Sequence, residues 1–431
     1  MEISRRNFIK TTAFSAMAAM SYKAFAQSQN KPNIALIGLG VIGKVNYNIF
    51  SQLPCNIVAI CDINPAVTAK IESAQKIPFF TSYKEMFAKM GDKIDGVVIS
   101  TPDHQHFPIA KYAISQKKHV YLEKPMCRVL DEVKALKQLA AENPKLCLQL
   151  GIQSHSRKGI RICSHVIRKG ILGDVKRVIA IRSKSWAGCA MQSYYPEEPI
   201  PQGLDWKGWL GENAEYIPYN HKYVDQFWRP FWRFSNGAIG DISSHILDIP
   251  FYALELEGPF SAICVNQVGG NEISIPMCDH IRMFANSKFQ KNSPVQIDWY
   301  AGFKNVKPGE KYYEEIQKNL LPIIPDDIDL PFNRLCGDGQ IIIGTKGVLY
   351  SPAMHLGGKP VLLPRKFGKK YAEELNHEFG EKIEKDSHHL NWLNAICGKA
   401  KLSAPFEYGT ELTTLVLTAA KALKDKVGAK A

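Results

Sequence analysis

Short apolar runs alternate with longer amphipathic stretches over the first third of the chain. The runs have the length and β-branched content of buried strands, and the stretches between them repeat apolar residues at helical spacing. The runs lie at 33–37, 57–62, 96–100, 119–122 and 146–150. Helices are expected from 41 to about 53 and near 64–75, 82–90, 104–116, 129–141 and 156–169. This alternation predicts an α/β Rossmann-type domain with a doubly wound parallel sheet at residues 31–154.

The pattern changes after Gly173. Further strands are expected at 175–185, 260–267, 281–285, 295–301 and 340–350. The segment 186–235 is loop-like and rich in tryptophan, and 302–333 has the composition of a long loop. Helices are expected at 240–256, with a kink at Pro250, and near 386–397 and 409–424. This mixture predicts a second domain of α+β type at residues 155–431, with a mostly antiparallel sheet and a role in substrate binding.

The first 26 residues have the order of a twin-arginine export signal. The basic segment is Ser4-Arg5-Arg6-Asn7-Phe8-Ile9-Lys10, an apolar stretch covers 11–22, and Ala24-Phe25-Ala26 is a cleavage site. The alternative, a frayed helix that happens to contain two arginines, does not account for this order. Residues 1–26 are therefore expected to be removed, and the protein is expected to be periplasmic or otherwise exported through the twin-arginine machinery. That route carries folded proteins, so a cofactor would bind before export and stay tightly bound.

Charge and cysteine usage exclude several classes of partner. The formal charge of +13 falls to about +10 without the signal, and no basic block stands out, which argues against nucleic-acid binding. After cleavage no apolar run approaches the length of about 18 residues that a membrane span requires. The ten cysteines are scattered singly, without the spacing of a zinc site. We therefore expect no membrane span and no metal.

A glycine-rich turn follows the first predicted strand. Gly38, Gly40 and Gly43 form a G-x-G-x-x-G motif that opens a helix at Val41 and Ile42. The glycines permit a tight turn, close approach of a pyrophosphate to the backbone, and close helix–strand packing. Asp62 ends the second strand, where a carboxylate binds the ribose diol and repels a 2′-phosphate. The motif predicts a dinucleotide site with NAD preferred over NADP.

Polar segments follow the next strands, at the sheet edge where ligands of open α/β sheets bind. Thr101-Pro102-Asp103-His104-Gln105-His106 comes after one strand and Glu123-Lys124-Pro125 ends the next. The residues expected to border the cofactor are Thr101, Pro102, His104, His106, Glu123, Lys124 and Gln153.

Three residues are candidates for proton transfer. Asp241 and His245 are four residues apart on a predicted helix and share a face, so the carboxylate can orient the imidazole and stabilise its charged form. Lys124 can stabilise negative charge on a reacting oxygen or relay its proton. Considered alone, the Asp-x-x-x-His pattern would be interpreted as two residues on one helix face with no catalytic role. Lys124 at a strand end beside the dinucleotide site favours the catalytic interpretation. Asp241 and His245 with Asp248 could also suggest a metal site, as could His104 with His106. Neither group has a further clear ligand at the spacing that such a site needs.

Together these residues resemble the Gfo/Idh/MocA family of oxidoreductases. The resemblance rests on the glycine motif, Asp62, the Thr-Pro-Asp-His and Glu-Lys-Pro segments, the Asp241–His245 helix, Gly344-Thr345-Lys346-Gly347 and the closing helices. It implies a Rossmann domain beside a domain with a large open sheet, whose face often forms homodimers or homotetramers. It also implies Lys124 as the family lysine and His245 as acid/base, supported by Asp241.

The tryptophan-rich segment offers candidates for substrate contact. It resembles a bacterial subgroup of the family through Leu204-Asp205-Trp206-x-x-Trp209 and Trp228-Arg229-x-x-Trp232. Trp206, Trp209 and Trp232 would stack on sugar rings, or form an aromatic core instead. Arg229 would bind a substrate carboxylate or cap a loop.

The expected activity is hydride transfer between a sugar or glycoside hydroxyl carbon and a tightly held nicotinamide cofactor. One alternative is a redox-neutral, NAD-dependent glycoside hydrolase that oxidises the sugar transiently. The members of the family that do this carry Glu-Val-Pro and Tyr-Pro-Thr-His, where this chain has Glu123-Lys124-Pro125 and Asp241-Ile-Ser-Ser-His245. The other alternative, a non-catalytic sugar or nucleotide sensor, would be expected to have lost the lysine or the histidine.

Overall fold

Six parallel strands form the first sheet of the structure, a computed structural model. It describes residues 31–69, 71–212, 214–320, 338–352, 360–379 and 387–428; the predicted export signal lies outside them. The strands are β1 (Asn33–Ile37), β2 (Asn56–Cys61), β3 (Phe79–Phe80), β4 (Gly96–Ile99), β5 (His119–Glu123) and β6 (Leu148–Gly151), in the order β3-β2-β1-β4-β5-β6. Because helices cover both faces, these strands are continuous apolar runs with no polar alternation.

The connecting helices agree with the predicted spacing in most places. They are α2 (Val41–Phe50), η1 (Pro65–Thr68), α3 (Glu72–Gln75), α4 (Tyr83–Met90), η2 (Gly91–Lys93), α5 (Asp103–Ser115), α6 (Leu130–Glu142) and η3 (Gln153–Ser156). The helix expected at 64–75 is instead divided into η1 and α3. Asn64 caps η1 by accepting a hydrogen bond from the Ala66 amide. The two-residue strand β3 was missed because it is too short to show a period.

The second sheet has seven strands, in the order β13-β12-β11-β7-β10-β9-β8. They are β7 (Val175–Arg182), β8 (Leu256–Val268), β9 (Cys278–Ser287), β10 (Gln290–Ala301), β11 (Gly339–Gly344), β12 (Val348–Pro352) and β13 (Val361–Leu363). Only the pairing of β7 with β10 is parallel, which confirms a mostly antiparallel sheet. The single strand expected at 340–350 is a hairpin, because 345–347 turn the chain between β11 and β12.

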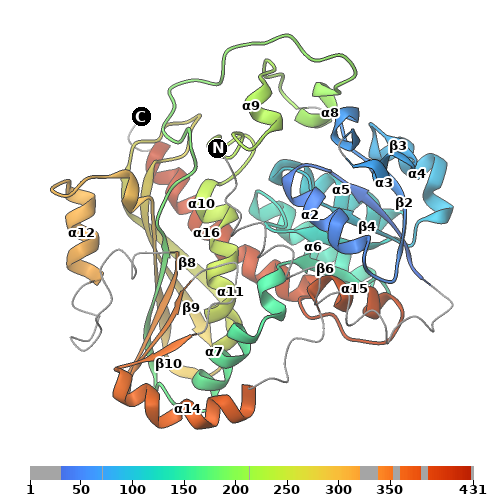
Figure 1. Cartoon of the computed structure of the whole chain (residues 1–431). Coiled ribbons are helices and arrows are strands. Elements are labelled where there is room, and N and C mark those ends of the chain that lie inside the picture. Colours follow the sequence, from blue (N-terminus) through green and yellow to red (C-terminus); the bar gives the residue numbers. More distant parts are fainter. Residues whose placement is uncertain are drawn as a thin grey trace.

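Helices α11 (Ser243–Ala253) and α16 (Phe406–Gly428) lie between the two sheets (Figure 1). With α7 (Lys158–Arg168) and α10 (Gly237–Asp241) they cover the inner face of the second sheet. The outer face carries η4 (Phe303–Asn305) and α12 (Lys311–Leu320), so part of the predicted loop 302–333 is helical. Three further helices were not predicted: α8 (Trp206–Leu210) and α9 (His221–Val224), both within the segment expected to be a loop, and α14 (Arg365–Phe379).

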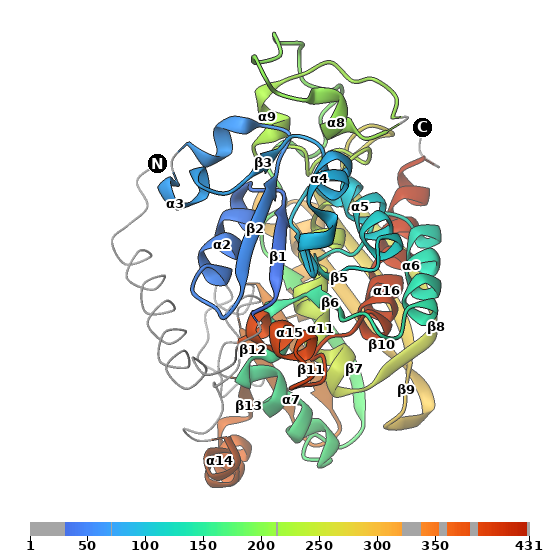
Figure 2. The ribbon, with the colours of Figure 1, turned by 90° about the vertical axis from the view of Figure 1, so that its right-hand side faces the viewer.

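Helix α15 (His388–Ile396) returns to the first sheet, where it lies beside β6 (Figure 2). Trp392 is fully buried against the same core as Ile34 and Leu36 of β1, and its indole nitrogen donates to the Cys147 carbonyl at 3.0 Å. Although the predicted division places residues 155–431 in the second domain, α15 packs against the core of the first sheet. The apolar face of α15 packs against strands that lie far away in the sequence. A division of the chain at one sequence position cannot predict such a contact.

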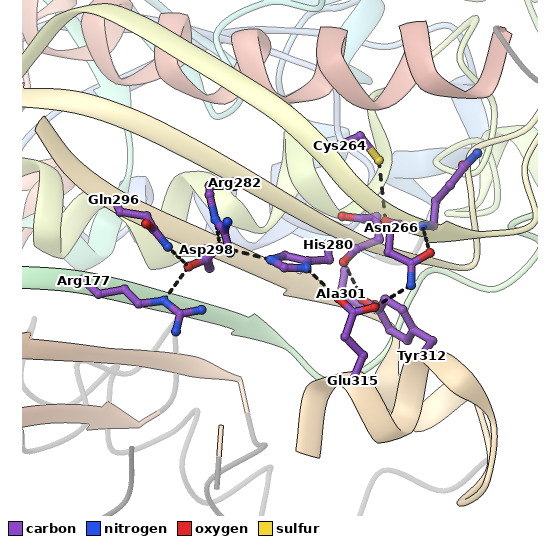
Figure 3. Close-up of polar contacts among 12 residues, drawn as sticks. Arg177, Cys264, Asn266, His280, Arg282, Gln296, Asp298, Ala301, Tyr312 and Glu315 are labelled. Carbon is purple, nitrogen blue, oxygen red and sulfur yellow. Dashed lines mark hydrogen bonds and ion pairs between the residues drawn. The ribbon is translucent and has the colours of Figure 1, made fainter. Parts of the chain in front are cut away.

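The outer face of the second sheet holds a buried charge network around Asp298 (Figure 3). The Asp298 carboxylate accepts hydrogen bonds from Arg282 at 2.8 Å, Arg177 at 2.5 Å and the His280 ring at 3.0 Å. The other ring nitrogen of His280 lies 2.9 Å from Glu315 on α12. This network joins three neighbouring strands to the helix that covers them.

Candidate active site

The glycine turn between β1 and α2 has the shape that a dinucleotide requires. Gly38 has φ +88°, and a Cβ there would lie 2.8 Å from the Ser100 backbone. A Cβ on Gly43 would lie 2.1 Å from the Gly38 carbonyl oxygen, so only glycine allows this helix–strand contact. At Gly40 a Cβ would meet nothing within 4 Å, and Val41 and Ile42 beside it are exposed. The start of α2 is thus open to an anionic group such as a pyrophosphate.

Asp62 lies beside this turn. Its carboxylate accepts hydrogen bonds from the Leu39 amide at 2.7 Å and the Asn64 amide at 2.9 Å. Burial raises the pKa of the Asp62 carboxyl, although both amides and Lys44 oppose the rise. The residue is held next to the glycine motif, which is the position from which a carboxylate binds a ribose diol.

A buried polar network lies beneath the turn, and Asn46 is at its centre. The Asn46 amide nitrogen donates to Glu123 and to Ser100, each at 2.9 Å. Gln153 donates to the same Glu123 oxygen at 2.8 Å. Burial raises the pKa of the Glu123 carboxyl to about 7, against the hydrogen bond from Asn46, the charge of Lys124 and the bond from Gln153. Glu123 and Gln153, predicted to border the cofactor, are therefore brought together.

Sequence reasoning missed Asn46, although one signal was available. Asn46 follows Gly43 by three residues, on the face of α2 that the glycine packs against β1. Its side-chain oxygen lies 3.0 Å from a His389 ring nitrogen on α15. A polar residue on the buried side of an otherwise apolar helix indicates a partner in the core.

The two histidines of the Thr-Pro-Asp-His segment contact protein rather than facing open space. His106 lies between the carbonyl oxygens of Pro125, at 2.6 Å, and Thr101, at 2.8 Å. Burial lowers the pKa of His106 to about 4, so the neutral ring donates to one of these carbonyls at a time. His104 bonds the Trp209 carbonyl at 2.7 Å, and burial lowers its pKa to about 3. His106 thus holds the backbone beside Pro102 and Lys124, and His104 ties the segment to Trp209 of the second domain.

Lys124, Asp241 and Arg229 form a charge cluster between the domains. Lys124, at the carboxyl end of β5, bonds one Asp241 carboxylate oxygen, and its Nζ lies 3.2 Å from the Asp241 carbonyl oxygen. Arg229 donates through Nε to the other carboxylate oxygen at 3.0 Å. Burial acts to raise the pKa of Asp241, but the charges of Lys124 and then Arg229 outweigh it and hold the pKa well below its usual range.

Asp103 is a second buried acid near this cluster, and sequence reasoning did not select it. It accepts a hydrogen bond from the Ser235 hydroxyl at 2.8 Å, and that hydroxyl accepts one from the Gly237 amide at 3.2 Å. Burial and then the negative charge of Asp241 raise the pKa of Asp103 to about 7, against Arg229, Ser235 and Lys124. The position of Asp103 directly after Pro102, in a motif already considered functional, was the available signal.

The helix expected to carry Asp241 and His245 is two helices. α10 ends at Asp241, Ile242 lies between, and α11 begins at Ser243, so the break is not at Pro250, which α11 accommodates. His245 is buried, and the positive charge that its ring carries when protonated contributes to lowering the pKa of Asp241. The two carboxylate oxygens of Asp241 bond Lys124 and Arg229. Asp241 therefore binds Lys124 and Arg229, in addition to the electrostatic interaction with His245 that the sequence suggested.

The three tryptophans proposed to stack on sugar are buried, Trp206 and Trp209 in an aromatic cluster and Trp232 in the main hydrophobic core. Trp206 and Trp209 stack on each other with ring centroids 4.7 Å apart, and the Trp206 nitrogen donates to the Ile217 carbonyl. Trp232 donates to the Asn271 carbonyl at 3.0 Å. Because neighbouring side chains cover these rings, the structure favours the core interpretation over substrate stacking. Different tryptophans, Trp186 and Trp228, flank Arg229.

Comparison with known proteins gives the family. Residues 32–151 match the model of an oxidoreductase family with an NAD-binding Rossmann fold, and residues 159–266 match its C-terminal alpha/beta domain. The chain belongs to the Gfo/Idh/MocA oxidoreductase family. The resemblance, the two-domain fold and the NAD cofactor expected from the sequence are confirmed.

Members with curated names give a range of activities. Levoglucosan dehydrogenase of Pseudarthrobacter phenanthrenivorans is 25% identical over 246 residues, 54% of this chain and 52% of its own length. Glycosyl hydrolase family 109 protein 2 of Shewanella sp. strain ANA-3 is 28% identical over 203 residues, 40% of this chain and 44% of its own. The chain thus spans about half the length of the curated relatives it matches.

Solved structures of the same fold cover nearly the whole chain. The WlbA dehydrogenase of Bordetella pertussis, in complex with NADH and UDP-GlcNAcA, has a TM-score of 0.61 at 17% identity over 93% of this chain and 97% of its own. The scyllo-inositol dehydrogenase of Lactobacillus casei, with NAD(H) and scyllo-inositol, has a TM-score of 0.51 at 16% identity over 92% of this chain and 98% of its own. At these identities the likeness establishes the Gfo/Idh/MocA fold.

The described part of the molecule also bears on membrane spans and metal sites. No helix there has the length and hydropathy to cross a membrane. Among the same residues, no group of three or more His, Cys, Asp or Glu side chains is arranged to hold a metal ion.

Proposed function

We propose that this Gfo/Idh/MocA oxidoreductase transfers hydride between a hydroxyl-bearing carbon of a sugar or glycoside and a tightly held NAD. The observation that supports the proposal is the cluster of Lys124, Asp241 and Arg229 between the two domains. It lies at the carboxyl end of β5, the sheet edge where open α/β sheets bind their ligands. The levoglucosan dehydrogenase relative acts on a carbohydrate, which agrees with this substrate class.

The residues of the site divide the work. Gly38, Gly40 and Gly43 with Asp62 would hold NAD, which when bound accepts the hydride. Lys124 is paired with an ionised Asp241, so it acts as a cation that stabilises negative charge on the substrate oxygen. His245 is buried beside Asp241 and takes up the hydroxyl proton as the general base.

The test begins with the purified protein, because a tightly held cofactor travels with it. Mass spectrometry of the denatured protein is expected to release NAD. Incubation with a panel of sugars and methyl glycosides is then expected to raise NADH absorbance for at least one of them. Turnover of that compound should fall in His245→Ala while bound NAD stays at the wild-type level. Full turnover in that variant would contradict the role of His245, and a protein without nucleotide would contradict tight binding.

A second candidate function is redox-neutral glycoside hydrolysis, favoured by the similarity to glycosyl hydrolase family 109 proteins. A nitrophenyl glycoside separates the two activities without any added electron acceptor. Free nitrophenol with no net NADH identifies a hydrolase. A keto-glycoside with NADH identifies a dehydrogenase.

Export belongs to the same proposal, since an exported enzyme that carries its NAD needs no supply outside the cytoplasm. Arg5→Lys together with Arg6→Lys is expected to leave the protein in the cytoplasm, measured by cell fractionation. Exported variant protein would contradict the twin-arginine route.

We also propose that the protein is a homodimer or homotetramer, which light scattering of the purified protein measures directly.

A further inference from the structure

The guanidinium group of Arg229 lies close to two indole rings. Its central carbon is 4.7 Å from the Trp186 ring centroid and 4.4 Å from that of Trp228, within the range of cation–π contacts. Its Nε bonds Asp241, while its two terminal nitrogens make no hydrogen bond to another described residue. The edge formed by these terminal nitrogens is therefore the part of Arg229 that remains for a further partner.

Neighbouring groups add more donors without partners. The Trp186 indole nitrogen is buried and has no acceptor among the described residues. The same is true of Nε of Arg182, whose guanidinium carbon lies 5.7 Å from the Trp186 ring and whose Nη1 is paired with Asp338. Indole and guanidinium nitrogens can only donate hydrogen bonds. This corner of the site therefore needs oxygen acceptors, and a buried donor without one costs stability.

The acceptors nearby are already used. Both Asp241 oxygens are bound by cations, and Asp103 accepts from Ser235. A sugar hydroxymethyl group could accept hydrogen bonds here, but it would also bring a further donor and no negative charge. A carboxylate brings only acceptors, and its two oxygens match the in-plane edge of a guanidinium.

We infer that the substrate is an acidic sugar, a uronic acid or its glycoside, whose carboxylate binds the free edge of Arg229 and the indole nitrogen of Trp186. The inference rests on the proposed function for the location of the reacting hydroxyl, beside Lys124. The recognition of the carboxylate itself requires no hydride transfer, so it can be measured by binding alone.

The test compares matched ligands on the NAD-loaded protein. Methyl glucuronide is set against methyl glucoside, and methyl galacturonide against methyl galactoside, by calorimetry and by the fluorescence change of the tryptophans that flank Arg229. Charge-assisted bidentate bonds predict about 10- to 100-fold tighter binding of the uronide in at least one pair. Equal binding within both pairs, or binding of neither uronide, would overturn the inference.

Two variants show which groups are responsible. Arg229→Gln is expected to abolish the preference for the uronide. Trp186→Phe keeps the flanking ring and the Arg229–Asp241 pair but removes the indole donor, and about a 3- to 10-fold loss is expected for the uronide alone. Arg233→Gln, in the same loop, is the control and should bind like the wild type. A preference that survives both site variants would contradict the assignment.

The outcome separates this inference from the proposed function. Tight uronide binding without any NADH supports the inference and counts against the dehydrogenase. NADH formed equally from neutral and acidic glycosides supports the dehydrogenase and overturns the inference.

Discussion

Two buried aspartates, Asp241 and Asp298, are each surrounded by cationic side chains. For both carboxyl groups burial acts to raise the pKa, and the neighbouring donors and charges bring it well below its usual range. The origins of their partners differ. Asp298 is paired with Arg177, Arg282 and His280 from the two strands beside its own, whereas Asp241 is paired with Lys124 from the Rossmann domain and Arg229 from the tryptophan-rich segment.

The second difference lies in what remains available for a ligand. Around Asp298, His280 uses both ring nitrogens within the protein, and Gln296 adds a further bond to the carboxylate at 2.7 Å. Around Asp241, Arg229 keeps a free edge, and Asp103 is an acid with its pKa displaced in the opposite direction. A buried ion pair is therefore weak evidence for catalysis by itself. Unused donors and neighbouring acids with separated pKa values are what distinguish the active site.

The largest effect is expected from Lys124→Ala. The variant removes the cation that stabilises the substrate oxygen, and turnover of the sugar that reduces bound NAD should fall by about 100- to 10,000-fold. Arg229 still pairs with Asp241, so the melting temperature should change little. The exposed Lys176→Ala is the matched control. If Lys124→Ala turned over at the wild-type rate, the two clusters would not differ in function.

Asp298→Asn should give the opposite result. Without the carboxylate charge, Arg177 and Arg282 are left uncompensated in the sheet, and the free energy of unfolding should fall by about 3–5 kcal/mol. Denaturant unfolding measures the loss, and turnover of the folded fraction should remain at the wild-type value. A stable but inactive Asp298→Asn protein would show that the outer cluster takes part in catalysis.

The smallest effect is the pH dependence contributed by Asp103. Its pKa is 3.8 when unperturbed and about 7 in the folded protein, so the folded state binds the extra proton between these values. Stability from this group is present below about pH 4 and is lost as the pH rises towards 7. Asp103→Asn keeps the Ser235 contact and cannot ionise. Over this pH range its free energy of unfolding should rise relative to that of the wild type by about 1–4 kcal/mol. Parallel stability curves for the two proteins would contradict the raised pKa.

The sequence predicted the parts of this fold whose chemistry is local. Strands β1, β2 and β5 follow from apolar runs. The turn at the cofactor site follows from the spacing of its glycines, because only glycine fits the backbone conformation and the close contacts there. Two partners of Asp241 could not be predicted in this way. Spacing on one helix suggested His245, whereas Lys124 and Arg229 reach Asp241 from distant segments. Trp206 and Trp209 show the same limit, because aromatic residues at a binding surface and in a core have the same sequence pattern.

The return of α15 to the first sheet has a consequence for the order of synthesis. A nascent chain emerges from its N-terminus, so β1 and β4 leave the ribosome long before Trp392 is translated. Until then the surface that α15 covers, next to Gly96 and Tyr121, is exposed to water. The His389 contact to Asn46, beneath the glycine turn, is also missing at that stage. The nucleotide domain is thus completed by residues made only after most of the second domain, which couples its maturation to the synthesis of that domain.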